Sequence, residues 1–300
     1  MGLTGKNTIA GDLSAEGSQT FTSVNPRTKA AGDVNFHNAT AAEIDRAVRA
    51  AAAAFKDTKN YPASRLADFL DVAADEIEAL GDDLLQITDM ETALGIPRLT
   101  GERGRTTGQL RAFGRLLREG SYVEAIIDSA MPDRQPAPRP GIRRMLVPLG
   151  PVGVFSASNF PFAFATAGGD TAAAFAAGCP VIVKGHPGHP ATTELFAQAL
   201  TRAVEKSGFP KGFFSMIQGN TIEVGQELVK HPLLEAVGFT GSLRGGRALY
   251  DLAAARPKPI PVYAEMGSIN PMVILPYAIA ARGDAIADGL VNSVNLGAGQ

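Results

Sequence analysis

Apolar residues in the first part of the chain recur at helical spacing. The first predicted helix opens at a capping box, in which Thr40 is followed three residues later by Glu43. Four apolar residues then share one helical face: Ile44, Val48, Ala51 and Phe55. A second apolar stripe runs from Leu66 to Leu80, and a further helix is predicted from Gly101 to Leu117. We expect these helices to pack through amphipathic faces.

From Pro151 onward the pattern changes to short apolar runs separated by helical segments. The predicted strands are Val152–Phe155, Val181–Lys184, Phe213–Ile217, Glu235–Phe239, Val262–Glu265 and Met272–Leu275. Helices are predicted after Phe162, Pro190 and Thr221. Strands and helices that alternate in units of about 30 residues are typical of a doubly wound parallel α/β sheet. Such sheets bind ligands at the carboxyl ends of their strands.

Two segments do not fit this alternation. Residues 1–35 are polar and rich in turns, which predicts short strands or an arm. Residues 131–140 contain four prolines, which excludes a helix or a central strand. We therefore expect an extended arm at 119–148 that reaches another subunit.

The composition is that of a soluble globular protein. Of 300 residues, 45% are apolar and 19% are charged, and the net charge of −2 argues against a nucleic-acid surface or a basic membrane anchor. The longest apolar stretch, from Phe160 to Gly178, is broken by Pro161 and Asp170, so no membrane span is predicted. The single cysteine, Cys179, excludes an intrachain disulfide and is consistent with a cytoplasmic protein.

No metal site is predicted either. His186 and His189 are three residues apart, but Pro187 and Pro190 interrupt any helix that would align them.

Three polar residues stand at or near the ends of predicted strands. The charge of Lys184 either reaches solvent along its aliphatic stem or meets a ligand such as a ribose. A half-buried Glu265 would serve as a general base, or it is satisfied by backbone donors. The amide of Asn159 can donate to a developing oxyanion, although an asparagine before Phe-Pro also commonly holds a turn.

A glycine-rich segment follows the predicted strand that ends at Phe239. Glycine lets a pyrophosphate approach the backbone, and a helix N-terminus favours negative charge. The glycines here are Gly241, Gly245 and Gly246, which is not the Gly-x-Gly-x-x-Gly spacing of a dinucleotide fingerprint. A tight strand–helix turn without a ligand is therefore an equal alternative.

Taken in order, these segments resemble the aldehyde dehydrogenase superfamily. The matching motifs are Asn25-Pro26-Arg27-Thr28, Pro148-Leu149-Gly150-Pro151-Val152-Gly153, Asn159-Phe160-Pro161, Lys184, Gly208-Phe209-Pro210-Lys211-Gly212, Phe239-Thr240-Gly241-Ser242 and Glu265-Met266-Gly267. Each motif is short, but the ordered set runs through nearly the whole chain and is highly specific.

The resemblance also implies a domain organisation. A Rossmann-type dinucleotide-binding domain would cover 149–265, and 1–118 would be its N-terminal helical part. Residues 119–148 would form a bridging arm of a homo-oligomer, a dimer or a tetramer. Residues 266–300 would begin a truncated catalytic domain.

The same resemblance implies roles for individual residues. Asn159 would donate to the oxyanion, and Glu265 would activate the water that hydrolyses a thioester. Within the cofactor site, Lys184 would bind a ribose and Ser242 the pyrophosphate. The implied cofactor site comprises Ser156, Lys184, His186, Pro187, Gly225, Phe239, Gly241, Ser242, Gly246, Met266 and Gly267.

The nucleophile of this family is a cysteine shortly after a Gly-Gln or similar pair. The segment Asn295-Leu296-Gly297-Ala298-Gly299-Gln300 resembles the approach to that cysteine, so we expect the thiol beyond Gln300, in a longer enzyme. Cys179 matches a non-catalytic position and is expected to be buried. Residues 1–300 are then expected to bind cofactor without oxidising aldehyde unaided.

Two other functions stay open. One is a non-catalytic dinucleotide-binding fragment or pseudoenzyme. The other is an acyl-phosphate reductase of the same superfamily, which needs no hydrolytic base, so Glu265 argues against it.

Departures from the common family pattern narrow the branch. Ser268-Ile269 replaces the usual Gly-Lys pair, which resembles the branch of 2-oxoglutarate semialdehyde (2,5-dioxopentanoate) and bacterial fatty aldehyde dehydrogenases. We predict NAD(P)-dependent oxidation of 2-oxoglutarate semialdehyde, with a fatty or other aldehyde as the alternative. Pro187 stands where many NAD-preferring members carry a glutamate, which favours NADP over NAD. Arg105 and Phe160 are predicted to contact substrate, with a solvated surface role as the alternative for Arg105.

Overall fold

The centre of the computed structural model, which describes residues 2–296, is a mixed sheet. Five parallel strands form most of it: β7 (Val152–Phe155), β8 (Val181–Lys184), β9 (Phe214–Ile217), β10 (Ala236–Thr240) and β11 (Val262–Glu265). β1 (Asn7–Ile9) and β2 (Asp12–Ser14) add antiparallel strands beyond β9, which gives the order β11-β10-β7-β8-β9-β1-β2. The predicted doubly wound α/β sheet is confirmed.

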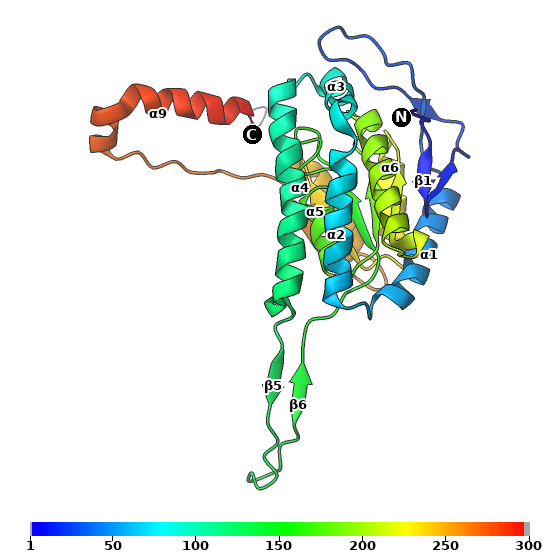
Figure 1. Cartoon of the computed structure of the whole chain (residues 1–300), viewed down its shortest axis with the longest axis vertical. Coiled ribbons are helices and arrows are strands. Elements are labelled where there is room, and N and C mark those ends of the chain that lie inside the picture. The colour runs from blue at the N-terminus through cyan, green and yellow to red at the C-terminus, as the bar shows by residue number, and fades with distance from the viewer. Residues whose placement is uncertain (1, 297–300) are drawn as a thin grey trace.

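Helices cover both faces of this sheet (Figure 1). On one face lie α2 (Ala63–Glu78), α3 (Gly81–Thr92), α4 (Ile96–Glu119), α5 (Gly169–Ala176) and α6 (Pro190–Lys206). On the other lie α1 (Ala41–Thr58), α7 (Ile222–Lys230) and α8 (Leu243–Ala254). Each layer has its own apolar core, so the sheet is buried on both sides, as its continuous apolar strands require.

The predicted capping box opens α1. Thr40 Oγ1 accepts from the backbone N–H of Glu43 at 3.2 Å, and Glu43 Oε2 accepts from the N–H of Thr40 at 2.8 Å. The predicted stripe from Leu66 to Leu80 belongs to α2, and α3 starts directly after it at Gly81. α4 begins at Ile96 rather than at Gly101, because Pro97 suits the first turn of a helix.

One predicted strand is wrong. Met272–Leu275 forms no strand, because no other strand lies beside it within residues 2–296 and the side chains of Met272, Val273 and Leu275 are exposed. The segment leads away from the body of the protein to α9 (Pro276–Leu296) (Figure 1). A run of apolar residues alone does not make a strand without a neighbour to accept its hydrogen bonds.

The proline-rich region lies in a long hairpin that projects from the body (Figure 1). A short helical turn, η1 (Ser121–Val123), leads into β5 (Ile126–Asp128), which pairs with β6 (Ile142–Arg144). Three short elements complete the fold: β3 (Thr20–Phe21), β4 (Phe36–His37) and η2 (Lys211–Phe213).

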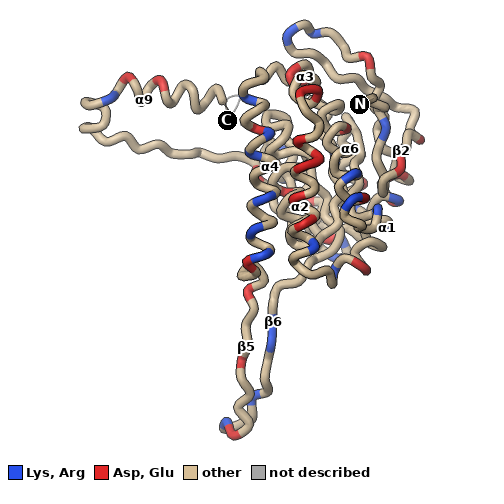
Figure 2. Tube along the Cα trace, in the orientation of Figure 1, with Lys and Arg blue, Asp and Glu red and all other residues tan. Residues whose placement is uncertain are grey.

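The helices α2 and α4 carry opposite charges along their contact (Figure 2). Arg111 on α4 binds Asp75 and Glu78 on α2, each at 2.7 Å. Arg118 binds Asp68 and Asp71 at the same distance. Exposed ion pairs of this kind each add little to stability. None of the helices in the described part of the chain is long and apolar enough to span a membrane.

Candidate active site

The carboxyl ends of β7, β8, β10 and β11 meet at one edge of the sheet. Neighbouring residues in a strand point to opposite faces, and residues paired across parallel strands share a face. Phe239 pairs with Phe155 and with Ala264, and Phe155 pairs with Lys184. Their side chains lie on the face covered by α7 and α8. Thr240 pairs with Glu265, and both point to the opposite face, which α5 covers.

On the α7–α8 face, small residues bring the two helices close to aromatic rings. The rings of Phe155 and Phe239 have centroids 6.2 Å apart. A Cβ on Gly225 of α7 would lie 3.0 Å from Cε1 of Phe155. A Cβ on Gly246 of α8 would lie 3.0 Å from Cε1 of Phe239 and only 2.4 Å from Cγ of Met266. The predicted residues Phe239, Gly246 and Met266 are therefore in one cluster, and Gly225 approaches it through Phe155.

Lys184 has its ammonium group in a largely buried position beside this cluster. Its Nζ donates a hydrogen bond to the carbonyl oxygen of Gly219 at 2.5 Å. Burial lowers the pKa of Lys184 to about 8. An ammonium group that has lost so much water is available to a hydroxyl or phosphate ligand.

His186 and Pro187 follow Lys184 in the loop between β8 and α6. The His186 ring stacks on that of His189, with centroids 5.4 Å apart. Burial, with the electrostatic effects of His189 and Lys184 as smaller causes, lowers the pKa of His186 to about 3. His186 is therefore neutral at physiological pH, and it offers a ligand a hydrogen bond rather than a charge.

The N-terminus of α8 adjoins the same cluster. Ser242 is the N-cap, and its Oγ accepts from the backbone N–H of Gly245 at 3.1 Å. The hydroxyl hydrogen of Ser242 and the exposed helix end remain available to an anion. The backbone N–H of Gly241 donates to the carbonyl oxygen of Glu265 at 3.0 Å, which joins this turn to the end of β11.

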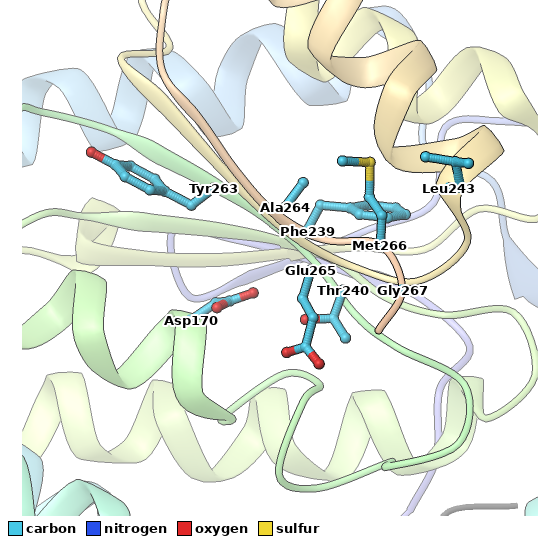
Figure 3. A pocket seen from close by; sticks show the side chains of 9 residues that line it. All are labelled: Asp170, Phe239, Thr240, Leu243, Tyr263, Ala264, Glu265, Met266 and Gly267. Carbon is cyan, nitrogen blue, oxygen red and sulfur yellow. The ribbon is translucent and has the colours of Figure 1, made fainter. Parts of the chain in front are cut away.

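A cavity of about 840 Å³ opens at the ends of β10 and β11 (Figure 3). Glu265 is exposed in it, and Gly267 continues its wall. Asp170, which our sequence analysis did not single out as a site residue, points toward Glu265 from α5 (Figure 3). The lining residues are Asp170, Phe239, Thr240, Leu243, Tyr263, Ala264, Glu265, Met266 and Gly267.

The loop that carries Asn159 follows β7. Ser156, its first residue, is buried, and no hydrogen-bond partner of its Oγ appears among the described residues. Arg98 of α4 donates to the backbone oxygen of Asn159 at 2.6 Å. The guanidinium groups of Arg98 and Arg105 lie 4.9 and 5.8 Å from the ring centre of Phe160. The predicted pair Arg105 and Phe160 is therefore in contact, although Arg105 itself is exposed.

A buried carboxylate anchors this loop. Glu102 Oε1 accepts the backbone N–H groups of Phe162 and Ala163, each at 2.9 Å. Burial raises the pKa of Glu102. Arg98, Glu102 and Arg105 are spaced by four and three residues, so they share one face of α4. The sequence shows this spacing. It does not show that this face of α4 points toward the loop that carries Asn159.

Asn159 and Glu265 do not lie on neighbouring strands. Asn159 follows β7 and Glu265 ends β11, with β10 between them. Strands lie ~4.8 Å apart in a sheet, so roughly 10 Å separates the strands that carry the two residues.

The thiol predicted for this chemistry is not provided by the described site. Cys179 is 3% exposed, and burial raises the pKa of its thiol, which makes it a poor nucleophile. The segment predicted to approach a catalytic cysteine runs from Asn295 to Gln300. Its residues 297–300 lie outside the described residues.

A profile described as the aldehyde dehydrogenase family matches residues 13–300. The chain is 51% identical to alpha-ketoglutaric semialdehyde dehydrogenase 2 of Azospirillum brasilense over 301 aligned positions, covering 100% of this chain and 57% of the relative. It is 49% identical to alpha-ketoglutaric semialdehyde dehydrogenase of Acinetobacter baylyi, covering 99% of this chain and 56% of the relative. The chain thus spans somewhat more than half the length of these relatives.

Among solved structures, the chain resembles aldehyde dehydrogenase C of Pseudomonas syringae, which was crystallised with NAD+ and octanal. The TM-score is 0.75 at 24% identity, over 90% of this chain and 52% of that one. At this identity the likeness concerns the fold alone.

Proposed function

Since this chain belongs to the aldehyde dehydrogenase family, we propose that it supplies the cofactor site, oxyanion donor and hydrolytic base for NAD(P)-dependent oxidation of 2-oxoglutarate semialdehyde to 2-oxoglutarate. The observation that carries this proposal is the arrangement at the sheet edge. Phe239 and Lys184 lie on one face, Glu265 lies on the other, and Asn159 follows the strand between β8 and β10.

The residues of the α7–α8 face fit a nicotinamide dinucleotide. The Lys184 ammonium group has one carbonyl partner in the described structure and can donate further hydrogen bonds to ribose hydroxyls. Ser242 and the N-terminus of α8 suit a pyrophosphate. The glycines at 225 and 246 let α7 and α8 pack directly on the aromatic rings of Phe155 and Phe239. Ser156, with its buried hydroxyl, is a further donor.

Asn159 and Glu265, at the strand ends, have different roles in the reaction. The bound cofactor would accept two electrons and a proton from the aldehyde carbon. The Asn159 amide donates to the oxygen that becomes negative when a thiolate adds to the carbonyl. Glu265 takes a proton from water, and the resulting hydroxide attacks the thioester. The thiolate leaves, and the product is the carboxylate. The thiolate must come from a cysteine other than the buried Cys179.

The face of α4 that carries Arg98 and Arg105 could bind the carboxylate at the far end of the substrate. Arg98 and Arg105 converge on Phe160, next to the backbone of Asn159. Arg98 is engaged with that backbone, while Arg105 is exposed and free to meet a carboxylate in a bidentate manner. An uncharged aldehyde would gain nothing from this contact.

The residue after His186 bears on the choice of cofactor. Pro187 places no negative charge near the ribose that Lys184 would bind. A 2′-phosphate is therefore not repelled, and the Lys184 cation attracts it. We expect NADP to be used at least as well as NAD. A kcat/KM for NAD more than tenfold above that for NADP would contradict this part of the proposal.

The decisive assay compares charged and uncharged aldehydes. Initial rates of the full-length enzyme with 2-oxoglutarate semialdehyde, glutarate semialdehyde and hexanal, each with NAD and NADP, give kcat/KM for every pair. The proposal expects the oxo-acid semialdehyde to be preferred. Preference for a long uncharged aldehyde would favour the fatty aldehyde alternative. Nucleotide binding without turnover of any aldehyde would favour a non-catalytic binding module.

We also expect homo-oligomers through the β5–β6 hairpin. Ile127 is 71% exposed and Val147 is 67% exposed, and Met145 and Leu146 between them are exposed as well. An exposed apolar ribbon of this kind is normally covered by a partner. Sedimentation of the wild-type protein and of an Ile127→Asp variant tests this expectation. Equal masses at every concentration would contradict it.

A further inference from the structure

Asp170 occupies a position that the reaction above does not use. It lies in the first turn of α5, and its side chain rests on β10. A Cβ on Gly238 would lie 3.1 Å from Cβ and 3.3 Å from Oδ2 of Asp170. Glycine at this point of β10 therefore lets the aspartate sit directly on the sheet.

The same face of the sheet carries Glu265. Gly238 pairs with Tyr263, and Thr240 pairs with Glu265, so all four share the face that α5 covers. The side chain of Thr240 also acts on Asp170, where it favours the charged form of the carboxyl group. Asp170 and Glu265 both line the cavity, and the carboxyl group of Asp170 points toward Glu265 (Figure 3).

The surroundings favour the protonated form of Asp170. Burial raises its pKa, the negative charge of Glu265 raises it further, and the Thr240 hydrogen bond lowers it. The first-turn position also favours the charged form, but only modestly. Aspartic and glutamic acids ordinarily have similar pKa values, ~3.9 and ~4.3. In this position Asp170 becomes a better proton acceptor.

The other charged groups of the neighbouring elements have different partners. On α4, Arg98 and Arg105 act on Glu102, and Arg111 and Arg118 bind the acidic residues of α2. α4 places the uncharged Gln109 beside Gly169, next to Asp170. Tyr263 is the other titratable residue that β11 presents on this face. Glu265 is thus the charged group that acts on Asp170.

We propose that Asp170 is a positioning residue for Glu265, with which it shares the proton that the base removes from water. This rests on the hydrolytic role proposed for Glu265. When water loses a proton to Glu265, its oxygen forms a bond to the thioester carbon, and the carbon–sulfur bond then breaks to release thiolate. The proton is shared between Glu265 and Asp170 and leaves to solvent from the exposed Glu265. Glu265 is ionised again before the next turnover.

A titration tests the coupling without any turnover. Residues 1–300 carrying [γ-13C]aspartate are titrated by carbon NMR, and the Asp170 signal is identified by its loss in Asp170→Asn. We expect Asp170 to titrate above the usual range for aspartate, and Glu265→Gln to shift its midpoint to lower pH. An unchanged midpoint in Glu265→Gln would show that the two carboxyl groups are not coupled and would overturn the proposal.

Transient kinetics test the role in hydrolysis. In the active enzyme, Asp170→Asn should retain the first-turnover burst of reduced cofactor but slow the steady-state rate by roughly tenfold or more. Asp170→Glu should restore part of the rate. Asp83→Asn, an exposed first-turn aspartate on α3, is the matched control.

The outcomes separate this proposal from the proposed function. If wild-type enzyme gives no burst and no turnover, the dehydrogenase function itself fails. If wild-type enzyme is active and Asp170→Asn has the same steady-state rate and pH profile, Asp170 has no part in hydrolysis. If Asp170→Asn loses the burst together with the steady-state rate, Asp170 supports the fold of the site and the proposal is overturned.

Discussion

Glu102 accepts the backbone N–H of Phe162 at 2.9 Å, and this bond holds the loop that follows β7 against the middle of α4. The same oxygen accepts the N–H of Ala163. Glu102→Ala would leave two buried donors without an acceptor, so we expect a loss of roughly 2 kcal/mol in the free energy of unfolding. Urea denaturation measures this loss.

The same substitution should loosen the Asn159 loop and lower kcat of the active enzyme more than it raises KM for the aldehyde. Glu205→Ala, at an exposed position on α6, is a suitable control and should change the unfolding free energy by less than about 0.5 kcal/mol. Equal stability of the two variants would argue against an anchoring role for Glu102.

Lys184 should make nucleotide binding depend on pH. Its pKa is lowered to about 8 by burial, so its positive charge is present below pH 8 and is lost above it. We expect the affinity for NADP to fall as the pH rises from 7 to 9. Lys184→Met should weaken binding by roughly tenfold at pH 7 and abolish this dependence. Calorimetric titration at several pH values is the measurement, with Lys230→Met, exposed near the end of α7, as control.

Glu91 should make the stability of the fold depend on pH. It lies buried on α3 and accepts the backbone N–H groups of Ala191 and Thr192 at the start of α6, at 2.8 and 2.9 Å. Burial raises its pKa from 4.5 to about 7. Because the folded pKa is the higher one, its contribution to stability is full below pH 4.5 and is lost as the pH rises through 7.

The expected loss over that window is up to ~3 kcal/mol, since one pKa unit corresponds to about 1.4 kcal/mol. Glu91→Gln should remove this slope whatever its effect on absolute stability. Denaturant unfolding at pH 5, 6 and 7 is the measurement. A Glu91→Gln variant with the wild-type slope would refute the assignment to Glu91.

Arg105 should discriminate between charged and uncharged aldehydes. Its guanidinium lies 5.1 Å from the ring centre of Phe164 and close to Phe160, near the Asn159 backbone. Arg105→Ala should raise KM for 2-oxoglutarate semialdehyde by roughly tenfold and leave KM for hexanal within a factor of two. Arg115→Ala, exposed farther along α4, controls for general effects on that helix. A parallel change for both aldehydes would exclude a carboxylate contact.

The sequence predicted those parts of the fold that depend on local pattern. The apolar runs of β7, β8 and β11 have the predicted bounds, and the capping box of Thr40 and Glu43 forms as expected. Met272–Leu275 has the same apolar character, but it lacks a neighbouring strand. Pairing partners are supplied by distant parts of the chain, so a local pattern cannot reveal their absence.

The acidic residues that anchor the site could not be predicted from the sequence for a related reason. Glu91, Glu102 and Asp170 are single acidic residues in helices, and nothing in their neighbours along the chain separates them from exposed ones. Their burial arises because α3, α4 and α5 turn them toward loops and strands encoded far away. Glu265, in contrast, stands at the end of a predicted strand. Parallel sheets bind ligands at the carboxyl ends of their strands, so this position could be predicted to lie in a site.

The alternation of side chains along β10 has an evolutionary consequence. Phe239 and Thr240 are adjacent in sequence, yet one faces the aromatic cluster and the other faces the carboxylates. A substitution at either position can therefore change one face of the sheet edge without changing the other. A one-residue insertion or deletion in β10 would exchange the two faces and damage both. Residues at this edge can thus change by substitution during evolution, whereas insertions and deletions in β10 would be selected against.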